Sequence, residues 1–145
     1  MINLSQIKKA HCIGIGGIGL SAIAEILLSR GIMVTGSDMK ESEITDNLIA
    51  KGAHIFLGHR EKNVEGADVV IYSAAVVADN PELVRAKELG ITIMTRAEML
   101  GELMKEHESS IAISGTHGKT TTTSMVSLIL DKAGKNPTIL VGGNL

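Results

Sequence analysis

Cysteine and aromatic residues are almost absent from this sequence of 145 residues. Cys12 is the only cysteine, so no disulfide bond can form within the chain. There is no tryptophan, and Phe56 and Tyr72 are single examples of their residue types. The 44% of hydrophobic residues can still form a core, but that core must be largely aliphatic. Cys12 lies in an apolar run, so we expect a buried core residue rather than a reactive thiol.

A surplus of positive charge is also missing. The formal net charge is -2, and charges of both signs are mixed along the chain. Because nucleic-acid binding needs a basic face, we do not expect a nucleic-acid partner. A small phosphorylated ligand needs only a local site and stays possible. The sequence indicates no oligomeric state.

Long hydrophobic runs are absent as well. No run approaches the roughly 18 apolar residues of a membrane-spanning helix, and the first residues lack a secretory pattern. We therefore expect no membrane partner. A reduced, cytoplasmic setting fits the single cysteine.

What the sequence does contain is an alternation of short β-branched runs with longer helical patterns. This alternation is typical of a parallel sheet with crossover helices, an α/β fold. The predicted strands are residues 10–15, 32–38, 53–58, 67–75 and 91–95, and the predicted helices are residues 18–31, 42–52, 80–90 and 96–107. Ser42 and Asn80 stand at the expected N-cap positions of two of these helices. Residues 1–107 therefore complete a doubly wound, Rossmann-like sheet.

The pattern starts again at Ser109 with a predicted strand at 109–115, a helix at 119–134 and a strand at 137–143. Two strands and one helix are too few to bury their own apolar faces in a stable domain. We therefore expect residues 108–145 to be the truncated start of a second domain, and the chain to be the front part of a longer protein.

A glycine-rich segment, Gly14-Ile15-Gly16-Gly17-Ile18-Gly19, joins the first predicted strand to the first predicted helix. Asp38 follows 19 residues after Gly19, at the end of the second strand. This is the dinucleotide-binding fingerprint, in which glycines let the backbone approach a diphosphate and the helix N-terminus offers free N–H groups. The alternative is that these glycines serve only tight packing of strand and helix.

The fingerprint does not identify the nucleotide. NAD would place a ribose on Asp38, while another diphosphate-linked ligand could use the same loop. Small residues at 73–75, Ser73, Ala74 and Ala75, follow the fourth strand, where ligands bind in open sheets. They would let a bulky ligand lie close, although an ordinary loop would also have this composition.

A second phosphate-binding pattern lies near the end of the chain. Residues 115–121 read Gly115-Thr116-His117-Gly118-Lys119-Thr120-Thr121 and end in the Gly-Lys-Thr of a P-loop, with a shorter spacing between the glycines than the usual pattern. Lys119 offers a positive charge to the outer phosphates of ATP, and Thr120 offers a hydroxyl to Mg²⁺. We also expect the first-turn threonines to cap the free N–H groups of the helix. The alternative is a solvated lysine at a helix start.

These motifs together resemble the Mur ligases. The matching stretches are GIGGIG, GSD, SAA, DNPE and GTHGKTTTT, which occur in this order over the whole chain. The resemblance is strongest to the branch that joins L-alanine to UDP-N-acetylmuramate with ATP, through an acyl phosphate. A related branch, which reattaches a recycled peptide to UDP-muramate, shares GTHGKTT and stays an alternative.

The resemblance also implies roles for individual residues. Residues 1–107 would bind the UDP substrate, and the residues expected to contact it are Ile15, Gly16, Gly17, Ile18, Gly19, Ser37, Asp38, Ser73, Ala74 and Ala75. Residues 115–121 would bind ATP, Lys119 and Thr120 would serve catalysis, and Thr120 would hold Mg²⁺. The remaining machinery would lie outside this chain, so we expect the fragment alone to be inactive.

Two other readings stay open. One is a fragment of a nicotinamide-dependent oxidoreductase, which the GxGxxG and Asp38 support but which gives the Gly-Lys-Thr loop no role. The other is a non-catalytic nucleotide-sensing module. Among single residues, Arg96 would either meet a ligand at the end of the fifth strand or simply begin a helix. His11, His54 and His59 stand singly near strand ends, and their spacing indicates no metal site.

Overall fold

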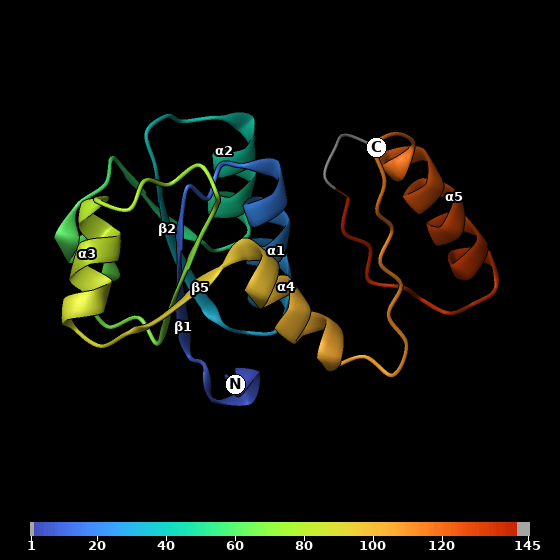
Figure 1. The fold of residues 1–145 in the computed structure, drawn as a ribbon, viewed down its shortest axis with the longest axis horizontal. Coiled ribbons are helices and arrows are strands. Elements are labelled where there is room, and N and C mark those ends of the chain that lie inside the picture. The colour runs from blue at the N-terminus through green and yellow to red at the C-terminus, as the bar shows by residue number, and fades with distance from the viewer. Residues whose placement is uncertain (1, 142–145) are drawn as a thin grey trace. The chain divides into compact units, whose positions relative to one another are not determined.

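The computed structural model describes residues 2–141. The chain divides into two compact units, with the boundary between Glu106 and His107 (Figure 1).

The first unit is built on one sheet of five parallel strands. The strands are β1 (Lys9–Ile13), β2 (Met33–Asp38), β3 (His54–Leu57), β4 (Val69–Tyr72) and β5 (Thr92–Thr95). Their order in the sheet is β3-β2-β1-β4-β5. In the centre, Ala10 of β1 pairs with Val34 of β2 on one side and with Val69 of β4 on the other. The predicted doubly wound parallel sheet is therefore confirmed.

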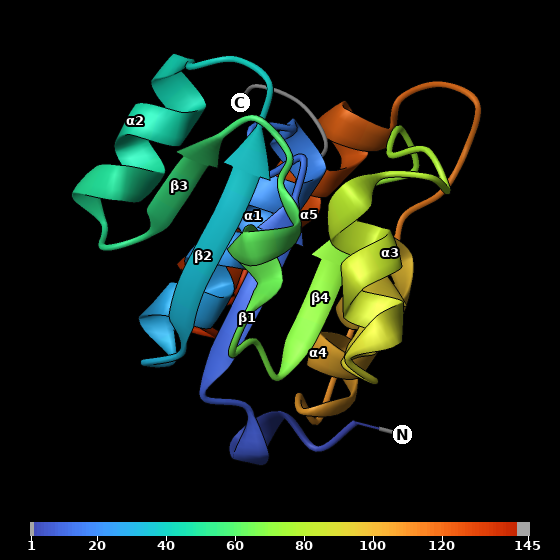
Figure 2. The same cartoon turned by 90° about the vertical axis from the view of Figure 1, so that its left-hand side faces the viewer.

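Helices cover both faces of this sheet. They are α1 (Ile18–Ser29), α2 (Glu43–Ala50), α3 (Pro81–Glu88) and α4 (Arg96–Lys105), joined by two short 3-10 helices, η1 (Leu4–Gln6) and η2 (Glu61–Val64). Helix α1 contacts α2 and α4 on one face, and α3 contacts η2 on the other (Figure 2). The 3-10 helices were not predicted, because three or four residues are too few to show a helical period.

The core is aliphatic, as the composition requires. The central strands are the most buried, and Cys12, Ile13 and Val70 have no exposed surface. The predicted burial of Cys12 is confirmed, and burial raises the pKa of its thiol to about 12. On the α3 face, Ile13 and Val70 pack in one apolar cluster with Val64 and Leu83.

The predicted helix caps are confirmed. The Ser42 hydroxyl accepts from Thr45 N at 3.3 Å, and Thr45 Oγ1 accepts from Ser42 N at 2.8 Å, so both sides of a capping box are present. Asn80 Oδ1 accepts from Glu82 N at 2.9 Å and begins α3 with Pro81 in its first turn. These caps fix where the chain turns from the sheet edge into each helix.

The second unit contains the predicted helix but not the predicted strands. Helix α5 runs from Lys119 to Lys132. The strand predicted at 109–115 is wrong, because these residues are irregular, and the described part of the strand predicted at 137–143 is irregular too. A strand exists only when a neighbour takes its hydrogen bonds, and residues 107–141 contain no strand to pair with. Residues 142 and 143 of the second predicted strand lie outside the described residues.

No helix within residues 2–141 combines the length and the apolar character that crossing a membrane requires.

Candidate functional site

From β1 the chain adds β2 and β3 toward one edge of the sheet, and it then returns to add β4 and β5 toward the other edge, so the strand order switches between β1 and β4. In open α/β sheets, ligands bind beyond the carboxyl ends of the strands at this reversal. The loops that follow β1 and β4 meet there, since a side chain on Gly14 would come within 3.2 Å of Ser73 Oγ and 3.7 Å of Val76 Cγ2. The two segments that the sequence indicated separately, 14–19 and 73–75, thus form one candidate site.

The glycine loop has a fixed shape set by backbone hydrogen bonds. Gly14 has a φ of 79°, in the left-handed region that favours glycine. Gly14 N and Ile15 N both donate to the carbonyl oxygen of Ser37, at 2.8 and 3.1 Å, and Gly17 N donates to Gly14 O at 3.1 Å. The end of β2 therefore holds the loop that follows β1.

Asp38 holds the same loop through its side chain. Its Oδ2 accepts from Gly16 N at 2.9 Å, and its Oδ1 accepts from Met39 N at 2.8 Å. A side chain on Gly16 would come within 2.8 Å of that carboxylate. Both carboxylate oxygens of Asp38 therefore accept hydrogen bonds from nearby backbone N–H groups of the protein.

The first turn of α1 faces the site with free donors. Gly17 is the N-cap and supplies no side-chain hydrogen bond. The N–H groups of Ile18 and Gly19 have no acceptor inside the helix at this position. These donors and the positive end of the helix dipole form a suitable place for a phosphate oxygen.

Arg96 adds a cation to this place. Its side chain crosses Gly19, since a side chain on that glycine would come within 3.0 Å of both Arg96 Cδ and Nη1. Arg96 is the first residue of α4 and is exposed. Within residues 2–141 its guanidinium has no hydrogen-bond or ion-pair partner. The sequence left Arg96 open between a ligand contact and a helix start. The structure shows that Arg96 begins α4, and that its side chain lies beside Gly19 in the first turn of α1.

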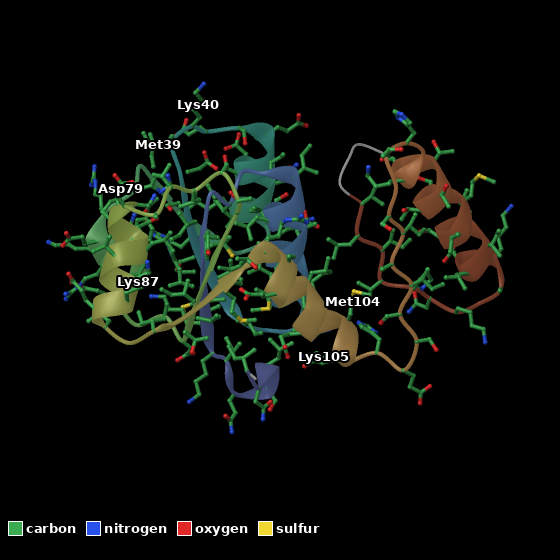
Figure 3. The ribbon with its side chains drawn as sticks, viewed as in Figure 1. Met39, Lys40, Asp79, Lys87, Met104 and Lys105 are labelled. Atoms are coloured by element: carbon green, nitrogen blue, oxygen red, sulfur yellow. The ribbon has the colours of Figure 1, made fainter. Side chains whose placement is uncertain are left out.

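The rim of the carboxyl edge is partly apolar. Ala74 and Ala75 are exposed beside Ser73, and Met39 and Val77 keep 64% and 63% of their surface exposed. Figure 3 shows Met39 and Lys40 beyond the end of β2, and Asp79 lies at the same end of the sheet.

The Gly-Lys-Thr segment in the second unit forms a loop that opens a helix. Gly118 has a φ of 76° and is the N-cap of α5. Lys119 Nζ donates to Gly115 O at 2.6 Å, so the lysine folds back across its own loop. The predicted capping by the first-turn threonines is wrong, since within residues 2–141 none of their hydroxyls accepts from a backbone N–H at the start of α5. The Thr123 hydroxyl, one turn into the helix, donates to Lys119 O at 2.7 Å. The Thr120 hydroxyl has no partner within residues 2–141.

Among the described residues, the histidines do not join other side chains in a group of three or more that could hold a metal ion. His54 packs edge-on against Phe56, with ring centroids 4.7 Å apart. His11 and His59 both contact the carboxylate of Glu82, at 3.3 and 3.1 Å. No sequence pattern indicated this grouping, because the residues are separated by more than 20 positions and only the fold brings them together.

Comparison with known proteins identifies the family. The sequence matches the family described as "Mur ligase family, catalytic domain" over residues 9–108, more than half of the chain. The chain belongs to the Mur ligase family. The resemblance seen in the motifs is thereby confirmed.

Two similar proteins have names that specify one ligase within this family. This Mur ligase chain is 58% identical over 140 residues to a UDP-N-acetylmuramate–L-alanine ligase from Alkaliphilus metalliredigens, covering 97% of this chain and 30% of that protein. It is similar to the crystal structure of a UDP-N-acetylmuramate–alanine ligase from Thermotoga maritima, with a TM-score of 0.89, 40% identity and coverage of 97% of this chain and 33% of that one.

A more distant match is a murein peptide ligase from Psychrobacter arcticus, with a TM-score of 0.81, 29% identity and coverage of 88% of this chain and 27% of that one. The chain thus spans about 30% of the length of the curated relatives it matches.

Proposed function

We propose that this Mur ligase chain is the substrate-binding part, with the ATP-binding loop attached, of a ligase that joins L-alanine to UDP-N-acetylmuramate. The observation that carries the proposal is the gathering of the glycine loop, Ser73 and Arg96 at the switch point of the sheet. Relatives that are more than half identical are named UDP-N-acetylmuramate–L-alanine ligases, and their names supply the substrate and the amino acid of the proposal.

In this proposal, residues 1–107 bind the UDP-sugar. The diphosphate lies against the first turn of α1, where the N–H groups of Ile18 and Gly19 donate to its oxygens. Arg96 then faces the second phosphate with a guanidinium that can donate two hydrogen bonds. Asp38 keeps the loop in shape, and the small residues 73–75 leave room for the rest of the ligand.

Residues 108–145 begin the ATP-binding domain in this proposal. ATP transfers its terminal phosphoryl group to the substrate carboxylate, which gives an acyl phosphate and ADP. The amine of L-alanine attacks the acyl carbon, phosphate leaves with the electron pair of the broken C–O bond, and the amine loses a proton as the amide forms. Lys119 neutralises charge on the transferring phosphoryl group.

Mg²⁺ fits the residues at this loop. Its usual partners are oxygen atoms, and Thr120 has a hydroxyl without a partner within residues 2–141, in the first turn of α5. When bound, the ion would supply charge neutralisation at the phosphates. His117, Thr116 and Thr121 lie in the same exposed segment and are proposed to contact ATP. The cytoplasmic location expected from the sequence stays a prediction.

Calorimetric titration of the 145-residue chain tests the proposal. UDP-N-acetylmuramate is expected to bind with a saturable signal, and NADH, titrated in parallel, is expected to give none. Binding of NADH alone would overturn the proposal and support an oxidoreductase.

The choice between L-alanine and a recycled peptide needs an activity assay of the ligase that contains this chain. Phosphate release that depends on L-alanine supports the proposal. Phosphate release that depends only on an L-alanyl peptide would assign the protein to the recycling branch.

A further inference from the structure

A carboxylate lies inside the first unit with no access to water. Glu82, the second residue of α3, has 0% exposed surface. Burying a charge is costly unless hydrogen bonds replace the lost water. Burial opposes the ionisation of Glu82, but hydrogen bonds from His11, Ser37 and Asn63 outweigh it, so the pKa of Glu82 lies below its usual value.

Four side chains from four elements meet the two oxygens of Glu82. Ser37 Oγ of β2 donates to Oε2 at 2.5 Å, and His59 Nδ1, in the loop after β3, lies 3.1 Å from the same oxygen. Asn63 Nδ2 of η2 donates to Oε1 at 2.6 Å, and His11 Nε2 of β1 lies 3.3 Å from that oxygen. Glu82 therefore ties α3 to β1, β2, the β3–η2 loop and η2.

The hydrogen-bond pattern fixes which atoms carry protons. Ser37 gives its only proton to Glu82, so His59 Nδ1, which is also 2.9 Å from Ser37 Oγ, must be a donor. His11 Nε2 must donate to Glu82, and its Nδ1 lies 2.8 Å from Thr35 Oγ1. Within residues 2–141, no buried side-chain nitrogen or oxygen lacks a partner. Both oxygens of Glu82 therefore receive their hydrogen bonds from side chains of the protein itself.

One member of this network also holds the glycine loop. The Ser37 hydroxyl binds Glu82, while the Ser37 carbonyl accepts from Gly14 N and Ile15 N. The next residue, Asp38, accepts from Gly16 N. A displacement of Ser37 would therefore move the acceptors that set the shape of the loop.

We infer that Glu82 is a positioning residue for the ligand site, acting on the glycine loop through Ser37. The inference rests on the proposed function for the identity of the ligand, but not for the effect on the loop. Glu82 itself does not touch the ligand. It holds the end of β2 at the place where that strand supports residues 14–16.

Three variants test the inference. Glu82→Ala removes all four contacts. Glu82→Gln keeps the shape, and its amide can accept from Asn63 and His11 and donate to Ser37, so it is the conservative rescue. Val70→Ala is the control, because Val70 is equally buried in the adjacent apolar cluster and takes no part in the network.

Two readouts separate positioning from general destabilisation. The amide NMR signals of Gly14 and Ile15, recorded without ligand, report the hydrogen bonds to Ser37 O. Titration with UDP-N-acetylmuramate reports the site. Glu82→Ala is expected to shift both amide signals and to weaken binding by about tenfold, the loss expected for one charge-assisted hydrogen bond. Glu82→Gln is expected to restore most of the affinity, and Val70→Ala to lower the melting temperature with binding unchanged.

Ser37→Ala keeps the test decisive if Glu82→Ala does not fold. It removes only the hydroxyl that links the network to the loop, and it is expected to shift the same two amide signals. Where both single variants fold, the double variant should bind no more weakly than Glu82→Ala alone, because the two residues act through one contact.

The inference is overturned if Glu82→Ala, or Ser37→Ala in its place, leaves the Gly14 and Ile15 signals unchanged, or if Val70→Ala weakens binding as much. If the unaltered chain does not bind UDP-N-acetylmuramate, the proposed function of this chain fails, and the ligand-free amide signals still decide the inference.

Discussion

Gly36 offers the sharpest test of how tightly the sheet supports the glycine loop. It lies in the middle of β2, paired with Cys12 of β1 and with Ile55 of β3. A side chain built on Gly36 would come within 2.5 Å of Ile15 Cδ1, 2.8 Å of Ile15 Cβ and 2.9 Å of Cys12 O. Ile15 has no exposed surface, so it cannot turn into solvent, and the Cys12 carbonyl is fixed in the sheet.

Gly36→Ala should therefore overpack the core. Inserting one methyl group into a closed core costs about 1–3 kcal/mol. For a unit of this size, a loss of about 2 kcal/mol lowers the melting temperature by roughly 10 °C. Because Ile15 belongs to the glycine loop, affinity for UDP-N-acetylmuramate should fall as well.

The assay is thermal unfolding followed by circular dichroism, with Gly101→Ala as the matched control. Gly101 lies inside α4, and a side chain there would meet no atom within 4 Å. Its replacement by alanine should leave the melting temperature unchanged or raise it, since alanine favours a helix by up to about 1 kcal/mol. The reasoning is refuted if Gly36→Ala melts at the temperature of the unaltered chain, or if both variants lose the same stability.

Three further predictions follow from single residues. Cys12 should resist a thiol reagent at pH 8 in the folded chain and react only on unfolding, because it is buried and its pKa is raised to about 12; rapid labelling of folded protein would contradict this. Arg96→Ala should weaken binding of UDP-N-acetylmuramate by about tenfold, the value of a charge-assisted contact. The control variant Lys87→Ala, at a residue far from the carboxyl edge in Figure 3, should leave binding unchanged. Equal losses in the two variants would count against a phosphate contact. Because the pKa of Glu82 is lowered, the folded state binds fewer protons than the unfolded state, and the ionised Glu82 stabilises the fold. This stabilisation is present above the unfolded pKa of about 4.5 and disappears as the pH falls through the folded pKa. In urea titrations, Glu82→Gln should flatten this loss of stability at acid pH, and an unchanged pH dependence would contradict the prediction.

Much of the first unit could be predicted from local sequence. Its strands and long helices have clear periods, and Ser42 and Asn80 mark helix starts with their own side chains. The glycine loop could be predicted too, because its signal and its function lie in consecutive residues. Each of these features depends on contacts between near neighbours in the chain.

The features that were missed depend on distant contacts. Ser37 and Glu82 are 45 positions apart and meet only because the fold brings the first turn of α3 near the carboxyl end of β2. The position of Arg96 over Gly19 depends in the same way on α4 packing against α1. The wrongly predicted strand at 109–115 has the right residues for a strand but no neighbour within residues 107–141 to pair with.

The central claim is that a diphosphate-linked sugar binds at the first turn of α1. The most direct measurement is a map of backbone amide shifts of the 145-residue chain as UDP-N-acetylmuramate is added. The account predicts that the largest changes occur at Ile18, Gly19 and Ser73, with smaller changes in β3 and α5. Saturable changes confined to another surface, or no change at these three residues, would contradict it.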